Sequence, residues 1–312
     1  MPEIDLIKFN GKPFDKLIDV ISQGIGTLYQ PREIRNEAES KAYEIEVIKK
    51  AKSKAIAAGK KEEAATYLRI QERILFSEVE RQNCIDNVAE IAADQLKNEK
   101  DISKEPVDKD WSKRFFNIVQ DISDEEMQII WGRILAGETK LPKSYSLRTL
   151  EFLKKLSKTD AEVFNKFAHI RIKSSDKNFI YNPKDDFLEK EFGISFSDKL
   201  LMTELGLVVD KHSLEFSLCA TADDQEINAL HYGDKAIILY RDREVPRQAI
   251  KVLVFTKIGL ELSKLIPQKF NLNYTELICS KFEHDSVHIE YGDFISLPDN
   301  RFRLLNKTQY NK

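Results

Sequence analysis

The fold is decided by residues 121–156, DISDEEMQIIWGRILAGETKLPKSYSLRTLEFLKKL, which predict two short amphipathic helices joined by a tight turn. Ser123 stands three residues before Glu126, which is the spacing of a capping box at a helix start. Apolar residues then recur at the spacing of one helical face. Gly137 is placed to end the first helix in a left-handed conformation, and Pro142 prevents the helix from resuming. This stretch therefore carries structure rather than chemistry.

Two further helix starts follow the turn. The second helix is expected to start near Ser144 or Ser146 and to bury a row of leucines. Thr159 and Glu162 repeat the capping-box spacing, which predicts one more helix. Together these segments predict a bundle of helices at the centre of the chain.

The central motif resembles the hallmark of a bacterial family, domain of unknown function 2806. Its pattern is SDE-x-x-Q-x-x-W-x-x-x-LAGE followed by S-x-R-T-L, and this chain has SDEEMQIIWGRILAGE followed by SLRTL. The matching positions include Trp131, Leu135, Gly137, Glu138, Arg148 and Thr149. The same region is loosely similar to the helical region of abortive-infection alpha proteins. The resemblance extends over most of the chain, its specific part is the central motif, and it implies no catalytic residues.

Four residues of this motif form a candidate interaction surface, namely Trp131, Arg133, Glu138 and Arg148. The alternative is that Trp131 lies in the core and that Glu138 and Arg148 hold the turn between the helices. Capping and turn chemistry already account for most of the motif, which favours the alternative.

Composition indicates a soluble cytoplasmic protein. The net charge is −3 over 312 residues, which argues against a generally basic nucleic-acid coat. Cys84, Cys219 and Cys279 are far apart and odd in number, which predicts no disulfide framework. The N-terminus lacks the pattern of a signal peptide, and no apolar run is long enough for a membrane helix.

The first third of the chain predicts a helical arm. Residues 32–98 are rich in strong helix formers, and Gly59 divides them into helices at 32–58 and 60–97. The apolar pattern of the second helix is sparse, so its apolar face is expected to pack against another copy of the chain or against the neighbouring domain, and association of two copies through this hairpin is a hypothesis. Residues 98–110 are polar and contain a proline, which predicts a linker.

The C-terminal third predicts a winged-helix-like module. A short helix ends at Gly193, Ser197 caps a second helix that stops at Gly206, and strands follow. Helix, turn, helix and two strands is the order of a winged helix-turn-helix. The predicted domains are residues 1–105, an N-terminal helical arm, 106–172, a central helical domain, and 173–312, a winged-helix-like domain. The predicted fold class is α+β, mainly α, with a long helical hairpin, a central bundle and a winged-helix-like α/β module.

The winged-helix interpretation identifies candidate nucleic-acid contacts, and these are Lys199, Arg241, Arg243, Arg247 and Lys251. Arginine and lysine side chains bind phosphate oxygens without reading the base sequence. The expected recognition helix, at 197–205, carries only Lys199 as a cation, which weakens sequence-specific recognition of DNA. The expected partner is therefore DNA or a protein.

No pattern identifies a catalytic residue, a metal site or a cofactor site. His284 and His288 lie four residues apart, with Cys279 as a conceivable third ligand, but the alternation around His288 predicts a strand that separates the two rings. The leading function is a binding protein rather than an enzyme. The alternatives are a phage-defence or abortive-infection effector, which rests on the loose resemblance, and a cryptic metal-dependent nuclease.

Overall fold

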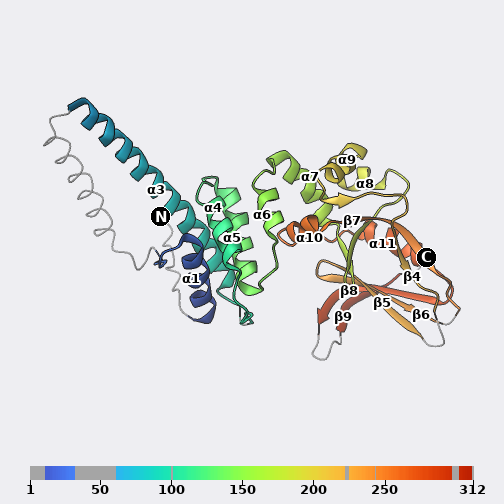
Figure 1. Cartoon of the computed structure of the whole chain (residues 1–312). Coiled ribbons are helices and arrows are strands. Elements are labelled where there is room, and N and C mark those ends of the chain that lie inside the picture. Colours follow the sequence, from blue (N-terminus) through green and yellow to red (C-terminus); the bar gives the residue numbers. More distant parts are fainter. Residues whose placement is uncertain are drawn as a thin grey trace, which may run out of the picture. The chain divides into compact units, whose positions relative to one another are not determined.

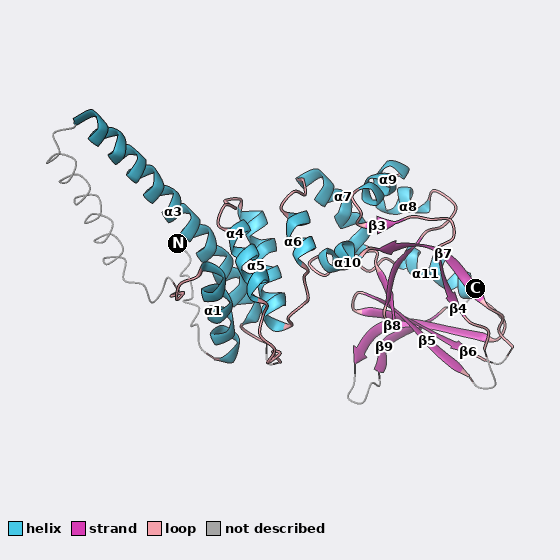
Figure 2. Ribbon diagram, in the orientation of Figure 1, coloured by secondary structure: helices cyan, strands magenta, loops and turns pink. Residues whose placement is uncertain are grey.

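The structure is a computed structural model, and it describes residues 11–31, 61–99, 101–221, 225–242, 244–296 and 302–310. The chain forms two compact units, Met1–Lys154 and Lys155–Lys312. The described part of the first unit is helical, and the strands lie in the second (Figures 1 and 2). The predicted α+β fold, mainly α, is confirmed, with an antiparallel sheet in the C-terminal half. The division between the units falls between Lys154 and Lys155, and the domain boundaries expected at residues 105 and 172 stay predictions.

The N-terminal unit contains the helices α1 (Lys12–Ile25), α3 (Lys61–Leu96), α4 (Lys109–Val119), α5 (Glu125–Lys140) and α6 (Leu147–Leu153). Helix α3 packs against α5, and α1 packs against α4. The α3–α5 contact is close because α5 carries Gly132, where a β-carbon would lie 2.4 Å from Cγ2 of Ile91. The predicted second helix of the arm is confirmed as α3, and the predicted first helix, at 32–58, lies outside the described residues.

Aromatic side chains form the core beneath the central motif. The rings of Trp111 and Phe115 stack with centroids 4.9 Å apart, and Trp131 meets Phe115 edge-on at 5.5 Å. The indole N–H of Trp111 donates to the carbonyl of Tyr145 at 2.8 Å, which ties α4 to the turn before α6. The motif tryptophan, Trp131, is fully buried.

Three predicted helix boundaries are wrong. Asp124, not Ser123, caps α5, since its carboxylate accepts from the backbone N–H of Met127 at 2.8 Å. Gly137 does not end α5. It lies inside the helix, where a β-carbon would approach the Tyr145 ring to 2.8 Å.

Ser157 rather than Thr159 caps the next helix, α7 (Lys158–His169). Ser146, one of the two predicted starts, is the N-cap residue of α6.

The C-terminal unit combines an antiparallel sheet with short helices. After α7, its helices are α8 (Phe187–Phe192), α9 (Phe196–Glu204), α10 (Lys257–Ser263) and α11 (Leu272–Phe282). Its strands are β1 (Ile172–Ser174), β2 (Lys177–Tyr181), β3 (Val208–Val209), β4 (Glu215–Leu218), β5 (Glu226–Tyr232), β6 (Lys235–Arg241), β7 (Gln248–Phe255), β8 (Val287–Ser296) and β9 (Phe302–Gln309). The strand order is β3-β7-β2-β1-β5-β6-β8-β9, and β4 also pairs with β7.

The predicted order of helix, turn, helix and strand is present in this unit. Gly193 follows α8 with φ +62°, and Gly206 precedes β3 with φ +68°, so both glycines adopt the left-handed conformation that tight helix ends favour. Strand β7 lies between β2 and β3 and pairs antiparallel with both. The hairpin of β5 and β6 stands in the chain between β4 and β7.

Helix α11 and a cluster of aromatic rings fill the core of this unit. Helix α11 packs on β6 and β7. The hydroxyl of Tyr274, on α11, accepts from the backbone N–H of Tyr181 at 2.7 Å. The stacked rings of Phe179 and Phe216 have centroids 4.5 Å apart, and Phe282 meets Phe216 edge-on. Within the described ranges, no helix has the length and apolar character to cross a membrane.

Candidate interaction surface on helix α9

Helix α9 is held in place by its N-terminal cap and by one buried side chain. The Ser195 hydroxyl accepts from the Asp198 N–H, and the Asp198 carboxylate accepts from the Ser195 N–H, which completes a capping box. The predicted cap, Ser197, is wrong by two residues. The Lys166 ammonium of α7 bonds the Gly193 carbonyl at 2.8 Å and Asp198 at 3.2 Å. Met202 is fully buried, so one face of α9 points into the unit.

The opposite face of α9 exposes two large apolar side chains. Phe196 is 79% exposed and Leu200 is 59% exposed. They lie one helical turn apart, and the exposed Glu204 continues the same row. Thr203 is also exposed, and its hydroxyl donates to the Lys199 carbonyl within the helix. The outer row of α9 is therefore apolar, then acidic, and contains no cation.

Lys199, the one cation of α9, is directed elsewhere. Its ammonium donates to Oδ1 of Asn182 at 2.8 Å, and the side chain is half-buried. Burial lowers the pKa of Lys199, while the nearby carboxylates of Asp210 and Glu189 act in the opposite direction. This ammonium already has a protein partner and lies within electrostatic range of two carboxylates, so it is poorly placed to bind phosphate.

Arg241 must be removed from the predicted nucleic-acid contacts. Its side chain is 0% exposed, at the end of β6. The guanidinium donates to the Cys219 carbonyl at 2.6 Å and to Oε2 of Glu226 at 3.2 Å. A phosphate cannot reach a buried group of this kind, so Arg241 holds the chain together instead.

Two of the remaining predicted cations, Arg247 and Lys251, share one carboxylate. Arg247 bonds Oε2 of Glu215 at 3.2 Å, and Lys251 bonds Oε1 of the same residue at 2.8 Å. Lys251 also donates to the His212 carbonyl at 2.6 Å. Hydrogen bonds from Lys251 and Arg247 lower the pKa of the Glu215 carboxyl, which is the effect expected of close opposite charges. The structure thus brings Arg247 and Lys251 together, and Arg243 lies outside the described residues.

The central-motif residues divide into two buried and two exposed side chains. Trp131 is fully buried and Glu138 is 2% exposed, so both point away from solvent. The Glu138 carboxylate accepts from the backbone N–H of Lys143 at 2.6 Å and from that of Tyr145 at 2.9 Å. Glu138 therefore organises the turn between α5 and α6. Arg133 and Arg148 are exposed, and their part in an interaction surface stays a prediction.

Replacing Glu138 by glutamine is expected to lower the free energy of unfolding by about 1–3 kcal/mol. Both carboxylate oxygens accept a backbone N–H, and a glutamine amide offers one oxygen, so one buried N–H loses its acceptor. Urea unfolding measures the change. Arg148→Gln, an exposed change in the same motif, is the control and should stay within about 0.5 kcal/mol of wild type. Equal effects of the two substitutions would contradict this assignment of Glu138.

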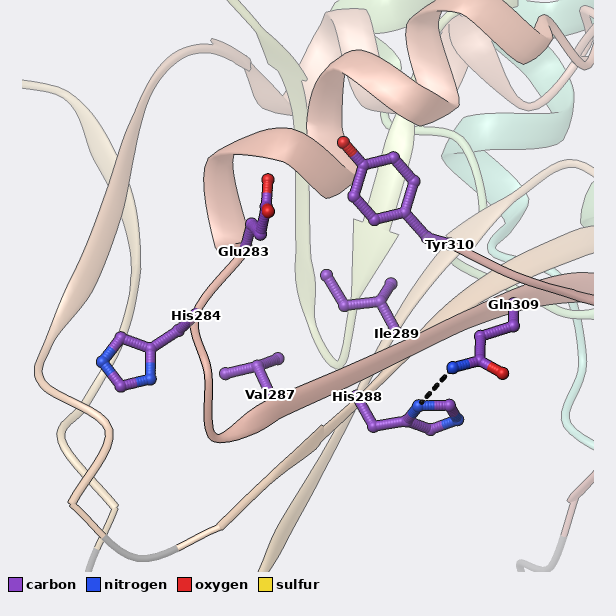
Figure 3. A pocket seen from close by; sticks show the side chains of 7 residues that line it. All are labelled: Glu283, His284, Val287, His288, Ile289, Gln309 and Tyr310. Carbon is purple, nitrogen blue, oxygen red and sulfur yellow. Dashed lines mark hydrogen bonds between the residues drawn. The ribbon is translucent and has the colours of Figure 1, made fainter. Parts of the chain in front are cut away.

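A cavity of about 310 Å³ lies beside the end of α11 (Figure 3). It is lined by Glu283, His284, Val287, His288, Ile289, Gln309 and Tyr310. The His288 ring lies 3.4 Å from the Gln309 amide through Nδ1 and 3.2 Å from Glu290 Oε1 through Nε2. The Nδ1 atom of His284 accepts from the Ser286 N–H, and this ring points away from His288.

These residues do not assemble into a metal centre. Cys279, the conceivable third ligand, is fully buried in α11, and burial raises the pKa of its thiol to about 12. In the part of the chain that the structure describes, no three His, Cys, Asp or Glu residues are grouped to hold a metal ion.

The apolar row of α9 is the surface that sequence reasoning missed. The winged-helix interpretation directs attention to the cations of this helix, whereas the i, i+4 spacing of Phe196 and Leu200 is the signal for an apolar row. The spacing of Phe196 and Leu200 does not stand out in the sequence, because Leu201, Met202 and Leu205 make most faces of this short helix apolar. Choosing the outer face required knowing that Met202 is the buried side chain.

These features define an α+β protein, mainly α, with a helical N-terminal unit and a C-terminal unit built on an antiparallel sheet. The chain belongs to the family described as protein of unknown function DUF2806, whose profile matches residues 68–279. This match confirms the family resemblance of the sequence. No curated protein and no solved structure matches the chain.

Proposed function

We propose that this chain is a binding protein that docks a protein partner, rather than DNA, through helix α9. The observation that carries the proposal is the outer row of α9, where Phe196 and Leu200 are exposed beside Glu204. Helices α8 and α9 are followed in the chain by strands β3 and β4, an order that resembles a winged helix, in which the second helix usually lies in the DNA groove. In this chain that helix offers apolar contact instead of cations.

The charge around α8 and α9 also favours a protein partner. Between residues 184 and 211 there are seven carboxylates against four lysines, which is a net charge of −3. Proteins that bind DNA gain most of their non-specific affinity by neutralising phosphates with lysine and arginine. A helical pair with a net negative charge is repelled by DNA, and the described cations among those predicted, Lys199, Arg241, Arg247 and Lys251, already have carboxylate or carbonyl partners.

Titration of random duplex and single-stranded DNA with the full chain tests the proposal. Fluorescence anisotropy is measured at two salt concentrations. We expect no DNA binding that both varies with salt and depends on α9. The decisive comparison is between wild type and Glu204→Gln, which removes a charge from the outer row. An affinity for DNA that rises at the lower salt concentration and is higher in Glu204→Gln than in wild type would indicate that DNA contacts α9. That result would contradict the proposal.

Exposed side chains on α3 support a separate proposal, that two copies associate through the arm. Among the side chains of α3 that the structure describes, the buried apolar ones begin at Cys84. Nearer its N-terminus the helix exposes Ile70, Ile74, Phe76 and Val79, and Phe76 is 68% exposed. Large apolar side chains gathered on one exposed helix favour association. Light scattering at micromolar concentration is expected to give a dimeric mass that falls on Phe76→Ser, and a monomeric wild type would contradict it.

A further inference from the structure

We infer that the partner of α9 is a basic amphipathic helix, whose apolar side chains contact Phe196 and Leu200 and whose lysine or arginine side chains meet the carboxylates around them. This inference rests on the proposed function, since it names the chemistry of the partner at the same surface. It follows from the shape of the apolar row and from the charges that border it.

The shape of the row suits another helix. Phe196, Leu200 and Glu204 are spaced at i, i+4 and i+8, so their side chains form one ridge along α9. Ridges of this kind pack into the grooves between ridges of a second helix. Large apolar side chains at the centre of such a contact contribute most of its free energy.

The charges at the border of the row select the partner. Glu204 ends the row, and the segment 184–211, which contains α8 and α9, carries seven carboxylates against four lysines. Lys199, the one cation of α9, donates to Asn182, and the outer row itself contains no cation. Complementary charge at the rim of an interface speeds association and excludes partners of the wrong sign.

The same carboxylates disfavour the other occupants of an apolar surface. An anionic membrane or a nucleic acid meets like charge at Glu204 and in the net negative segment 184–211. A second copy of α9 brings the same acidic residues to face one another. A helix that carries apolar residues on one face and lysine or arginine beside them satisfies both the apolar row and its acidic border.

A phage-displayed library of helical peptides, randomised at apolar and charged positions, tests this inference. The library is selected on the immobilised full chain, and in parallel on a Phe196→Ser, Leu200→Ser double variant. Both side chains are exposed, so the double variant is expected to keep the thermal midpoint of wild type. Glu204→Lys is a second variant, which changes the charge and leaves the apolar pair in place.

We expect peptides enriched on wild type to carry apolar residues at i and i+3 or i+4 and a net positive charge. Their affinity should fall about 30-fold for the double variant and about threefold to tenfold for Glu204→Lys. Enriched peptides that need Phe196 and Leu200 but are neutral or acidic would overturn this inference and leave the proposed function standing. No enrichment, or enrichment that is equal on the double variant, would overturn the proposed function as well.

Discussion

Gly259→Ala is expected to lower the free energy of unfolding of the C-terminal unit by about 3 kcal/mol, and its Tm by about 6–12 °C. A β-carbon at Gly259, in α10, would lie 2.0 Å from the backbone oxygen of Leu207. That oxygen already accepts from the backbone N–H of Thr256 at 3.0 Å. Neither atom belongs to a flexible side chain, so the helix must shift away from β3 and strain this hydrogen bond. Calorimetry or thermal unfolding followed by circular dichroism measures the change.

Gly193→Ala is the matched control for this prediction. Gly193 has a φ of +62° and nothing within 4 Å of an added β-carbon, so alanine meets backbone strain there without a clash. The cost of that strain is about 1–2 kcal/mol. A smaller loss of stability for Gly259→Ala than for Gly193→Ala would contradict the claim that α10 packs closely on the Leu207 backbone.

Arg241→Ala is expected to cost about 3 kcal/mol of unfolding free energy, the lower end of what removing one partner of a buried ion pair costs. The substitution leaves the Cys219 carbonyl without its donor and opens a cavity where the buried guanidinium lay. The lower end applies because Glu226, the other partner, is 39% exposed and is solvated when the arginine is gone. Urea unfolding measures the loss.

Arg247→Ala separates a structural arginine from a phosphate-binding one. Its partner, Glu215, also holds Lys251, and the Arg247 side chain is largely exposed, so its removal should cost less than about 1 kcal/mol. The winged-helix interpretation treats Arg241 and Arg247 alike as phosphate contacts. Equal stability effects of the two substitutions would contradict the structural role assigned to Arg241.

Local signals predict much of this fold. Strong helix formers across residues 60–97 predict α3, and the glycine after α9 predicts both its end and the start of β3. Apolar runs at 236–240 and 250–255 likewise predict β6 and β7. These predictions succeed because the deciding interactions lie within a few residues of one another along the chain.

Tertiary contacts explain the predictions that fail. Gly137 looks like a helix end, but the ring of Tyr145 packs over it and α5 continues. Arg241 follows a strand in a charged segment, which suggests a surface residue. It lies on the same face of β6 as Ile237 and Leu239, so strand alternation turns it inward. The alternation was present in the sequence, whereas the carbonyl of Cys219 that receives the guanidinium was not predictable from it.

The candidate surface needed the structure for a similar reason. Ser195 and Ser197 both fit the N-cap of α9, and only the reciprocal bonds with Asp198 identify Ser195. The identity of the buried side chain, Met202, then places Phe196 and Leu200 outside. The sequence shows which residues of such a helix are apolar, but it does not show which of them are exposed to solvent.

Hydrogen–deuterium exchange of the full chain, with and without a basic amphipathic peptide from the selection, tests the central claim most directly. Bound peptide is expected to slow amide exchange in α9, residues 196–204, and to leave the β8–β9 hairpin unchanged. Protection at β8–β9 or α3, with unchanged exchange in α9, would contradict the account and move the docking surface elsewhere.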